Sequence, residues 1–231
     1  MAYLTTSGGI SAEVYKLHIF WSFCISTPTT MSTKELDPYT VAAQNNDITP
    51  QQKISDLHKI IKATTTGMLT SRSADGQLHS RAMTPCAPKS DSQLSLIFLA
   101  NNASHKFDEI RNDDNVNVSF YDEKSTSWVS YAGKAQVSQN RELIKENWSA
   151  SVSAYFGDLK DGIHKGDEND PRVVIIKVIP DEIRYFVATK GAIARNVDAA
   201  VGAVTGHVAT PGELRTISKQ EIQLAEGLHT K

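Results

Sequence analysis

The stretch HSRAMTPCAPKSDSQLSLIFLANNASHK, residues 79–106, decides the fold of this 231-residue chain. Its first part alternates polar and apolar side chains, which is typical of a half-buried strand. Residues 94–100 form a continuous apolar run, which predicts a second strand, closed by Asn101 and Asn102. Phe107 and Ile110 then mark one face of a helix. Ser104 therefore stands where we expect that helix to begin.

Positive charge gathers at this predicted helix start. The first turn of a helix carries unpaired backbone N–H groups and the positive end of the helix dipole. His105 and Lys106 follow Ser104, and Arg81 lies on the neighbouring predicted strand. Together these groups have the chemistry of a phosphate pocket. A solvated helix cap beside an exposed strand arginine fits the same spacing, and the spacing alone leaves both interpretations open.

The rest of the chain reads as strands joined by short connections. Thr49-Pro50-Gln51-Gln52 is a capping-box pattern that predicts a helix over residues 50–63. The predicted strands cover residues 66–72, 77–86, 94–100, 116–121, 126–138 and 172–188, and further helices cover 104–111, 141–148 and 191–204. This order predicts a mainly β fold with peripheral helices, a six-stranded antiparallel split β-barrel. Gly133 and Pro180, inside two strands, predict a close backbone approach and a bulge or bend.

One domain with extensions on both sides is expected. We predict a flexible N-terminal extension over residues 1–48, a barrel domain over 49–210 and a C-terminal tail over 211–231. The apolar run at 17–25 is too short to span a membrane. It is either the core of a signal peptide or lies before an effective start at Met31.

Composition excludes several classes of function. A formal charge of −2 and scattered basic residues argue against a nucleic-acid partner. The two cysteines, Cys24 and Cys86, suggest no disulfide and a cytoplasmic location. The histidines form no ligand cluster, so we expect no metal site, and no segment suggests a membrane protein. The acidic loop at 157–170 reads as a solvated connection, because its carboxylates lack the spacing of a calcium loop.

An ordered set of short motifs resembles a known family. The set comprises R-A-M at 81–83, S-H-K-F at 104–107, Ile110 with Asn112, V-N-V-S-F at 116–120 and W-V-S-Y-A-G-K-A at 128–135. It resembles the pyridoxamine 5′-phosphate oxidase-like split barrels, and within them the general stress protein branch that includes fungal blue-light-inducible proteins. The resemblance covers about residues 49–195. It implies that FMN binds at the interface of a homodimer.

The resemblance also implies roles for individual residues. Arg81 and the triplet Ser104, His105 and Lys106 match the phosphate-binding positions, with His105 where the family has arginine. Histidine carries less charge than arginine near neutral pH, so we expect a weaker affinity for phosphate. The remaining matches are Ala82, Met83, Thr84, Leu99 and Ala100 beside the flavin ring, Trp128 at a flavin-contacting position or in the core, Phe186 at an aromatic position supplied by the other subunit, and Arg195 near a further basic contact.

Three functions remain open at this point. The first is an FMN-dependent oxidoreductase of a stress response that uses a small-molecule electron donor or acceptor. The second is a non-catalytic protein that binds or sequesters flavin. The third is a split barrel that keeps the dimer but holds another cofactor, such as a deazaflavin or haem, or none. The chain lacks the C-terminal basic and aromatic residues of the true pyridoxamine phosphate oxidases, so we do not expect that activity, and no catalytic residue can be named.

Overall fold

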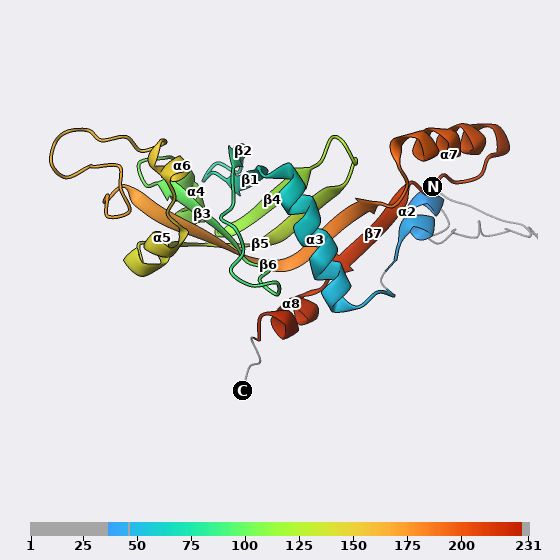
Figure 1. Cartoon of the computed structure of the whole chain (residues 1–231), viewed down its shortest axis with the longest axis horizontal. Helices are drawn as coiled ribbons and strands as arrows, with labels where there is room; N and C mark the ends of the chain where they lie inside the picture. Colours follow the sequence, from blue (N-terminus) through green and yellow to red (C-terminus); the bar gives the residue numbers. More distant parts are fainter. Residues whose placement is uncertain (1–36, 46, 228–231) are drawn as a thin grey trace, which may run out of the picture.

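A computed structural model describes residues 37–45 and 47–227, whose centre is an antiparallel sheet of seven strands curled into a split barrel (Figure 1). The strands are β1 (Gly67–Arg72), β2 (Leu78–Met83), β3 (Leu96–Asn101), β4 (Asn115–Tyr121), β5 (Trp128–Ser138), β6 (Val173–Ala188) and β7 (Gly212–Ile217). Six of them follow the order β2-β1-β4-β5-β6-β3, and β7 pairs with β6. The predicted mainly β fold and its six antiparallel strands are confirmed.

Strand β6 holds the barrel together. It pairs with β5 from Trp128↔Phe186 to Ser138↔Ile175, its first half also pairs with β3, and its second half pairs with β7. Beyond β2, the backbone N–H of Cys86 donates to the carbonyl of Ile97 in β3 at 2.7 Å. This hydrogen bond joins the two ends of the strand order. The segment from β2 to β3 that decides the fold is thereby brought onto one side of the barrel.

The predicted irregularity at Gly133 and Pro180 is confirmed. The register between β5 and β6 shifts between Ala132 and Gly133. A Cβ atom at Gly133 would lie 2.2 Å from the carbonyl oxygen of Ile179 and 2.7 Å from the Cα of Pro180. Both neighbours are backbone atoms that cannot turn aside, so only glycine allows the two strands to approach this closely.

Helices cover the barrel and its ends. They are α2 (Pro38–Ala43), α3 (Pro50–Thr64), α4 (Lys106–Asn112), α5 (Arg141–Asn147), α6 (Ala150–Ser153), α7 (Ala192–Thr205) and α8 (Lys219–Ala225). Helix α3 buries Ile54, Leu57 and Ile60 against the sheet. The predicted capping box at its start is only half present. Thr49 Oγ1 accepts from the N–H of Gln52 at 3.2 Å, but the Gln52 side chain donates to Asp56.

The C-terminal part of the structure differs from the predicted tail. Strand β7 completes the edge of β6, and α8 begins with a capping box between Ser218 and Glu221. Ile217 and Ile222 are 1% and 2% exposed. The Glu226 carboxylate accepts from the N–H groups of Leu94 and Ser95, at 3.0 and 2.7 Å, next to β3. Residues 212–226 are therefore part of the barrel, despite their polar composition.

The start of the described chain also packs on β7. Helix α2 lies within the predicted extension of residues 1–48, and the N–H of Asn45 donates to the carbonyl of Leu214 at 2.9 Å. The apolar run at 17–25 and Met31 lie outside the described residues. Within 37–45 and 47–227, no helix has the length and apolar character needed to cross a membrane.

Helix α7 stands at the opposite end of the sheet from α5 and α6 (Figure 1). The structure confirms the helix predicted over residues 191–204, as α7 runs from Ala192 to Thr205. An ion pair joins the helix to the segment just before it, with Lys190 Nζ 2.8 Å from the carboxylate of Asp198 in α7. Its apolar side chains are exposed, namely those of Ile193, Val197, Val201 and Val204.

Candidate functional site

A cavity of about 950 Å³ opens between the β2–β3 side of the barrel and helices α5 and α6. Its lining comprises Thr66, Arg81, Ala82, Met83, Thr84, Pro85, Cys86, Ala87, Lys89, Leu99, Ala100, Asn101, Lys106, Glu146, Asn147, Trp148, Ser149, Ser151, Val152, Tyr155 and Phe156. The cavity therefore has two walls, one from β2, β3 and the start of α4, and one from α5, α6 and the residues beside them.

Seven of the twelve predicted site residues lie together on the first wall. They are Arg81, Ala82, Met83, Thr84, Leu99, Ala100 and Lys106. The link between Cys86 and Ile97 brings β2 beside β3, and a tight turn after β3, in which the N–H of Ala103 donates to the Asn101 side chain, leads into α4. These segments, which are close in sequence, thus form one continuous surface of the cavity.

Arg81 is bound to a buried carboxylate behind the wall. Its guanidinium donates to Glu109 Oε2 at 2.6 Å and to the hydroxyl of Ser71, which itself donates to Glu109. His79 Nδ1 lies 2.6 Å from the other carboxylate oxygen. Burial tends to raise the pKa of Glu109, but the hydrogen bonds from Ser71, His79 and Arg81 outweigh it and hold the pKa at about 2. Glu109 is therefore ionised at neutral pH and offsets part of the positive charge of Arg81.

Lys106 supplies the other cation of this wall. Its partial burial, together with the nearby charge of Arg81, lowers the pKa of the ammonium group, and Glu109 opposes this. The Lys106 Nζ also lies 5.3 Å from the centroid of the Phe107 ring. The repulsion between the two cations on this wall falls when an anion lies between them. The wall is therefore suited to an anionic group.

The other two residues of the predicted triplet take different positions. Helix α4 begins at Lys106, with His105 as its N-cap residue and no side-chain capping hydrogen bond. Ser104 precedes the cap, and its carbonyl accepts from the N–H of Phe107 at 3.1 Å. Ser104 is half-buried and His105 is exposed, and neither lines the cavity. The predicted helix start at Ser104 thus lies two residues too early.

Three predicted residues lie away from the cavity of their own chain. Trp128 and Phe186 are cross-strand partners at the ends of β5 and β6. Arg195 lies on α7 and donates to the carbonyls of Ser125 and Lys190, each at 3.0 Å. None of the three is among the residues that line the cavity.

The second wall was not predicted. It presents three aromatic side chains, Trp148, Tyr155 and Phe156, from the end of α5 and the turn after α6. The rings of Trp148 and Phe156 lie 5.8 Å apart at 46°. Lys89 Nζ donates to the carbonyl of Glu146 at 2.6 Å, which ties the loop after β2 to α5. Only the tertiary fold brings this wall to β2, so local sequence patterns give no sign of it.

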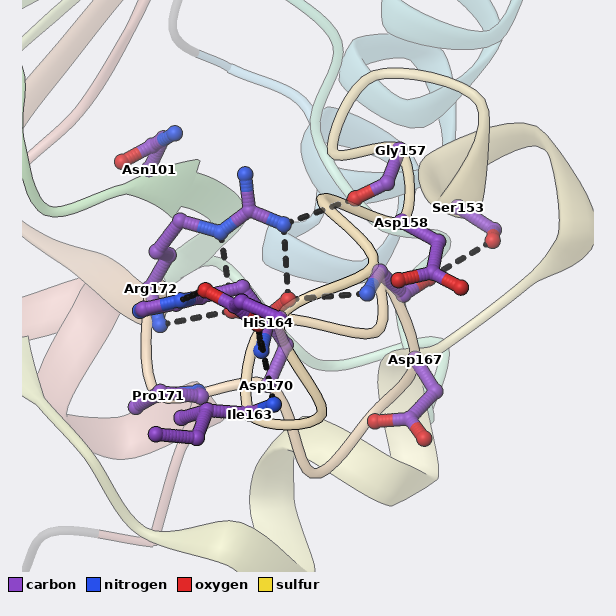
Figure 2. Close-up of polar contacts among 12 residues, drawn as sticks. Asn101, Ser153, Gly157, Asp158, Ile163, His164, Asp167, Asp170, Pro171 and Arg172 are labelled. Atoms are coloured by element: carbon purple, nitrogen blue, oxygen red, sulfur yellow. Dashed lines mark hydrogen bonds and ion pairs between the residues drawn. The ribbon is translucent and has the colours of Figure 1, made fainter.

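A buried ion pair fixes the second wall to the barrel (Figure 2). Asp170, 1% exposed, accepts from the N–H of Gly166 at 2.8 Å and from the Arg172 guanidinium at 2.7 Å. Arg172 also donates to the carbonyl of Gly157 at 2.8 Å, and its guanidinium lies 6.0 Å from the centroid of the Phe156 ring. The hydrogen bonds from Arg172 hold the pKa of Asp170 well below its usual range. The acidic loop, expected to be a solvated connection, thus ends in a buried anchor.

Chemical groups for proton transfer or nucleophilic attack are scarce at the cavity. Cys86 lines it, but burial raises the pKa of its thiol, which keeps the sulfur protonated and a poor nucleophile. The only carboxylate among the described lining residues is that of Glu146. The walls can bind and orient a molecule by charge, backbone and ring contacts, and any redox chemistry would come from a bound cofactor.

Comparisons with known proteins agree with this architecture. A family model described as pyridoxamine 5′-phosphate oxidase like matches residues 52–209. The protein bli-3 of Neurospora crassa is 36% identical over 197 residues, which cover 85% of this chain and 94% of that protein. A general stress protein 26 structure from Jannaschia sp. CCS1 has a TM-score of 0.54 at 17% identity, covering 72% of this chain and 98% of that one.

A protein related to general stress protein 26, from Clostridium acetobutylicum, has a TM-score of 0.53 at 10% identity and covers 74% of this chain and 98% of its own. At such identities the two structures support the fold alone. The family model covers more than half of the chain, and the fungal relative nearly all of its own length. The chain therefore belongs to the pyridoxamine 5′-phosphate oxidase-like family of split barrels.

Proposed function

We propose that the chain binds FMN in the cavity between β2, β3 and α5–α6 and acts as a flavin-dependent oxidoreductase of a stress response. The observation that carries the proposal is the first wall, on which seven residues matched to flavin contacts of the family lie side by side. They come from β2 and the residue after it, from β3 and from the start of α4, and all seven line one cavity. Its electron donor or acceptor would be a small molecule.

The chemistry of the first wall fits FMN. Arg81 and Lys106 offer two cations to the phosphate, although Glu109 offsets part of that charge. Strand β2 ends the strand order, so the backbone of Ala82 to Thr84 has one edge facing away from β1, where it can meet the polar edge of a flavin ring. A volume of about 950 Å³ leaves room beyond one small ligand. When bound, the flavin would supply hydride or electron transfer, while these residues bind it, orient it and exclude water.

We further propose a homodimer in which each cavity is completed by the other chain. Trp128, Phe186 and Arg195 match flavin-side positions of the family but lie outside the cavity of their own chain. In a two-fold dimer the same surface serves both chains, so residues at one end of the sheet can reach the cavity of the partner. A cytoplasmic location, without nucleic-acid or membrane partners, stays a prediction from composition.

A second candidate function is flavin binding without turnover. It is favoured by the scarcity of proton-transfer groups at the cavity, where the Cys86 thiol is held protonated. A deazaflavin or haem site is a third candidate, because His105 in place of the family's arginine is exposed rather than directed into the cavity. Pyridoxamine phosphate oxidation is not expected.

The first experiment is an absorbance spectrum of the purified protein, before and after FMN is added and free ligand is removed by gel filtration. Flavin bands that co-elute with the protein support the site, and turnover with a nicotinamide donor then separates an oxidoreductase from a binding protein. A protein that stays colourless after FMN is added contradicts the first two functions.

Arg81→Ala tests the phosphate assignment directly. The substitution removes a charge-assisted hydrogen bond and leaves the negative charge of Glu109 less compensated. We expect FMN binding to weaken by roughly 1.5 to 3 kcal/mol, while riboflavin, which has no phosphate, changes little. Calorimetric titration of both ligands measures the difference.

Arg111→Ala is the matched control, because Arg111 is an arginine of α4 whose side chain is 68% exposed and does not line the cavity. It should change neither affinity. Equal losses of FMN and riboflavin in Arg81→Ala would refute the phosphate role.

A further inference from the structure

We propose that the α5–α6 wall forms a second subsite that binds a planar, uncharged aromatic molecule beside the flavin. The inference rests on the proposed function, since it assigns the β2–β3 wall to FMN. It deepens that function by naming the class of small molecule that meets the flavin.

The first argument is an aromatic side chain that lines the cavity and is exposed. Tyr155 lines the cavity and is 87% exposed, more than any other tyrosine among the exposed large hydrophobic residues of the described chain. Trp148 lines the same cavity and packs against the buried Phe156. A flat ring entering the cavity would find the aromatic surfaces of Tyr155 and Trp148, and aromatic pairs favour stacked or edge-to-face contacts.

The second argument is that the wall is held rigidly. The buried Asp170 anchors Arg172 and Gly166, and the Ser153 hydroxyl donates to the carbonyl of Gly166 at 2.7 Å (Figure 2). Arg172 lies over Phe156, so the ring is fixed from behind. A preformed aromatic surface loses little entropy when a ligand binds, which is what a subsite requires.

The third argument is charge. The cations among the described lining residues are Arg81, Lys89 and Lys106. The proposed FMN phosphate takes up Lys106 and Arg81, which is also paired with Glu109, and Lys89 donates to the Glu146 carbonyl. A second ligand with phosphate groups would therefore find little compensating charge. An uncharged aromatic ring needs none, so the wall favours it over a dinucleotide.

The test is calorimetric titration of the FMN-loaded protein with 1-naphthol, a planar uncharged probe, and with 1-decalol, a saturated molecule of similar size. We expect 1-naphthol to bind more tightly than 1-decalol and to leave FMN in place. Tyr155→Ser should weaken 1-naphthol binding about 3- to 10-fold, the usual worth of an aromatic contact, without changing FMN affinity. Tyr39→Ser, at a tyrosine 41% exposed on α2 and outside the cavity, is the matched control and should change neither.

Three results would overturn the subsite: equal affinity for the two probes, release of FMN by 1-naphthol, or no effect of Tyr155→Ser. Failure of the proposed function is a separate result, because it shows as a protein that takes no FMN at all. In that event the titration is made on the FMN-free protein, where a loss of 1-naphthol affinity in Tyr155→Ser alone still supports the subsite.

Discussion

At the scale of single residues, Glu109 controls the charge of the cavity without lining it. Its carboxylate receives hydrogen bonds from Ser71, His79 and Arg81, and its pKa is about 2. A carboxylate that is ionised in the folded protein and protonated more easily in the unfolded chain stabilises the fold above its unfolded pKa. The same group both holds Arg81 in place and limits how strongly Arg81 attracts an anion.

Glu109→Gln separates these two effects. At pH 7 we expect unfolding in urea to require about 3 kcal/mol less free energy, because the pKa falls from 4.5 to about 2 on folding. The deficit should shrink as the pH falls from 4.5 towards 2, where the wild-type carboxylate becomes protonated as well. Urea titrations across this range measure it. A deficit that stays constant with pH would show that the ion pair contributes nothing.

The sequence predicted part of this residue pattern and missed the rest. Arg81 and Lys106 could be found because their motifs are short and recur in order. Glu109 was missed, yet it lies between Phe107 and Ile110 on the apolar face of α4, and a carboxylate on such a face signals a buried partner. The aromatic wall of Trp148 and Tyr155 had no such signal, because contacts between β2 and α6 are not local in sequence.

At the scale of elements, the order and type of the strands could be read from the sequence because each strand alternates or runs apolar over many residues. Strand β7 was missed because its six residues, GELRTI, carry two charged side chains. The charge of Arg215 is compensated inside the fold, by Asp56 at 2.6 Å and Glu213 at 2.8 Å. Helix α8 did leave a signal, since Ser218 and Glu221 stand at capping-box spacing before Ile222.

A chain that stops after Pro211 tests whether β7 and α8 are essential. It loses the buried side chains of Ile217 and Ile222 and leaves the edge of β6 unpaired, which exposes a strand edge to aggregation. We expect little soluble protein and no cooperative thermal transition by circular dichroism. A chain that ends at Gly227 keeps both elements and serves as the control. A soluble, cooperatively melting product from the shorter chain would mean that residues 212–225 are an accessory.

At the scale of the whole molecule, the proposed dimer makes each flavin site depend on two chains. Co-expression of an Arg81→Ala chain with a Trp128→Ala chain distinguishes shared sites from separate ones. In mixed dimers one cavity has both residues intact and the other has neither, so roughly a quarter of all sites should recover tight FMN binding. Neither variant alone should show this fraction. Titration of the mixture with FMN measures the fraction of recovered sites, and light scattering confirms a mass of twice 25.3 kDa. No recovery would place Trp128 outside the partner's site.

The contact between Asn45 and Leu214 joins the first part of the described chain to its last strand. Strand β6 can pair with β3 and β5 before β7 has been synthesised, but its second half lacks its last partner until then. During synthesis the hairpin of β1 and β2 can form as soon as it emerges, because its contacts are local, whereas the far edge of the barrel closes only once residues 212–217 have been made. Until then the second half of β6 carries an open strand edge, and such an edge can pair with the strands of other chains.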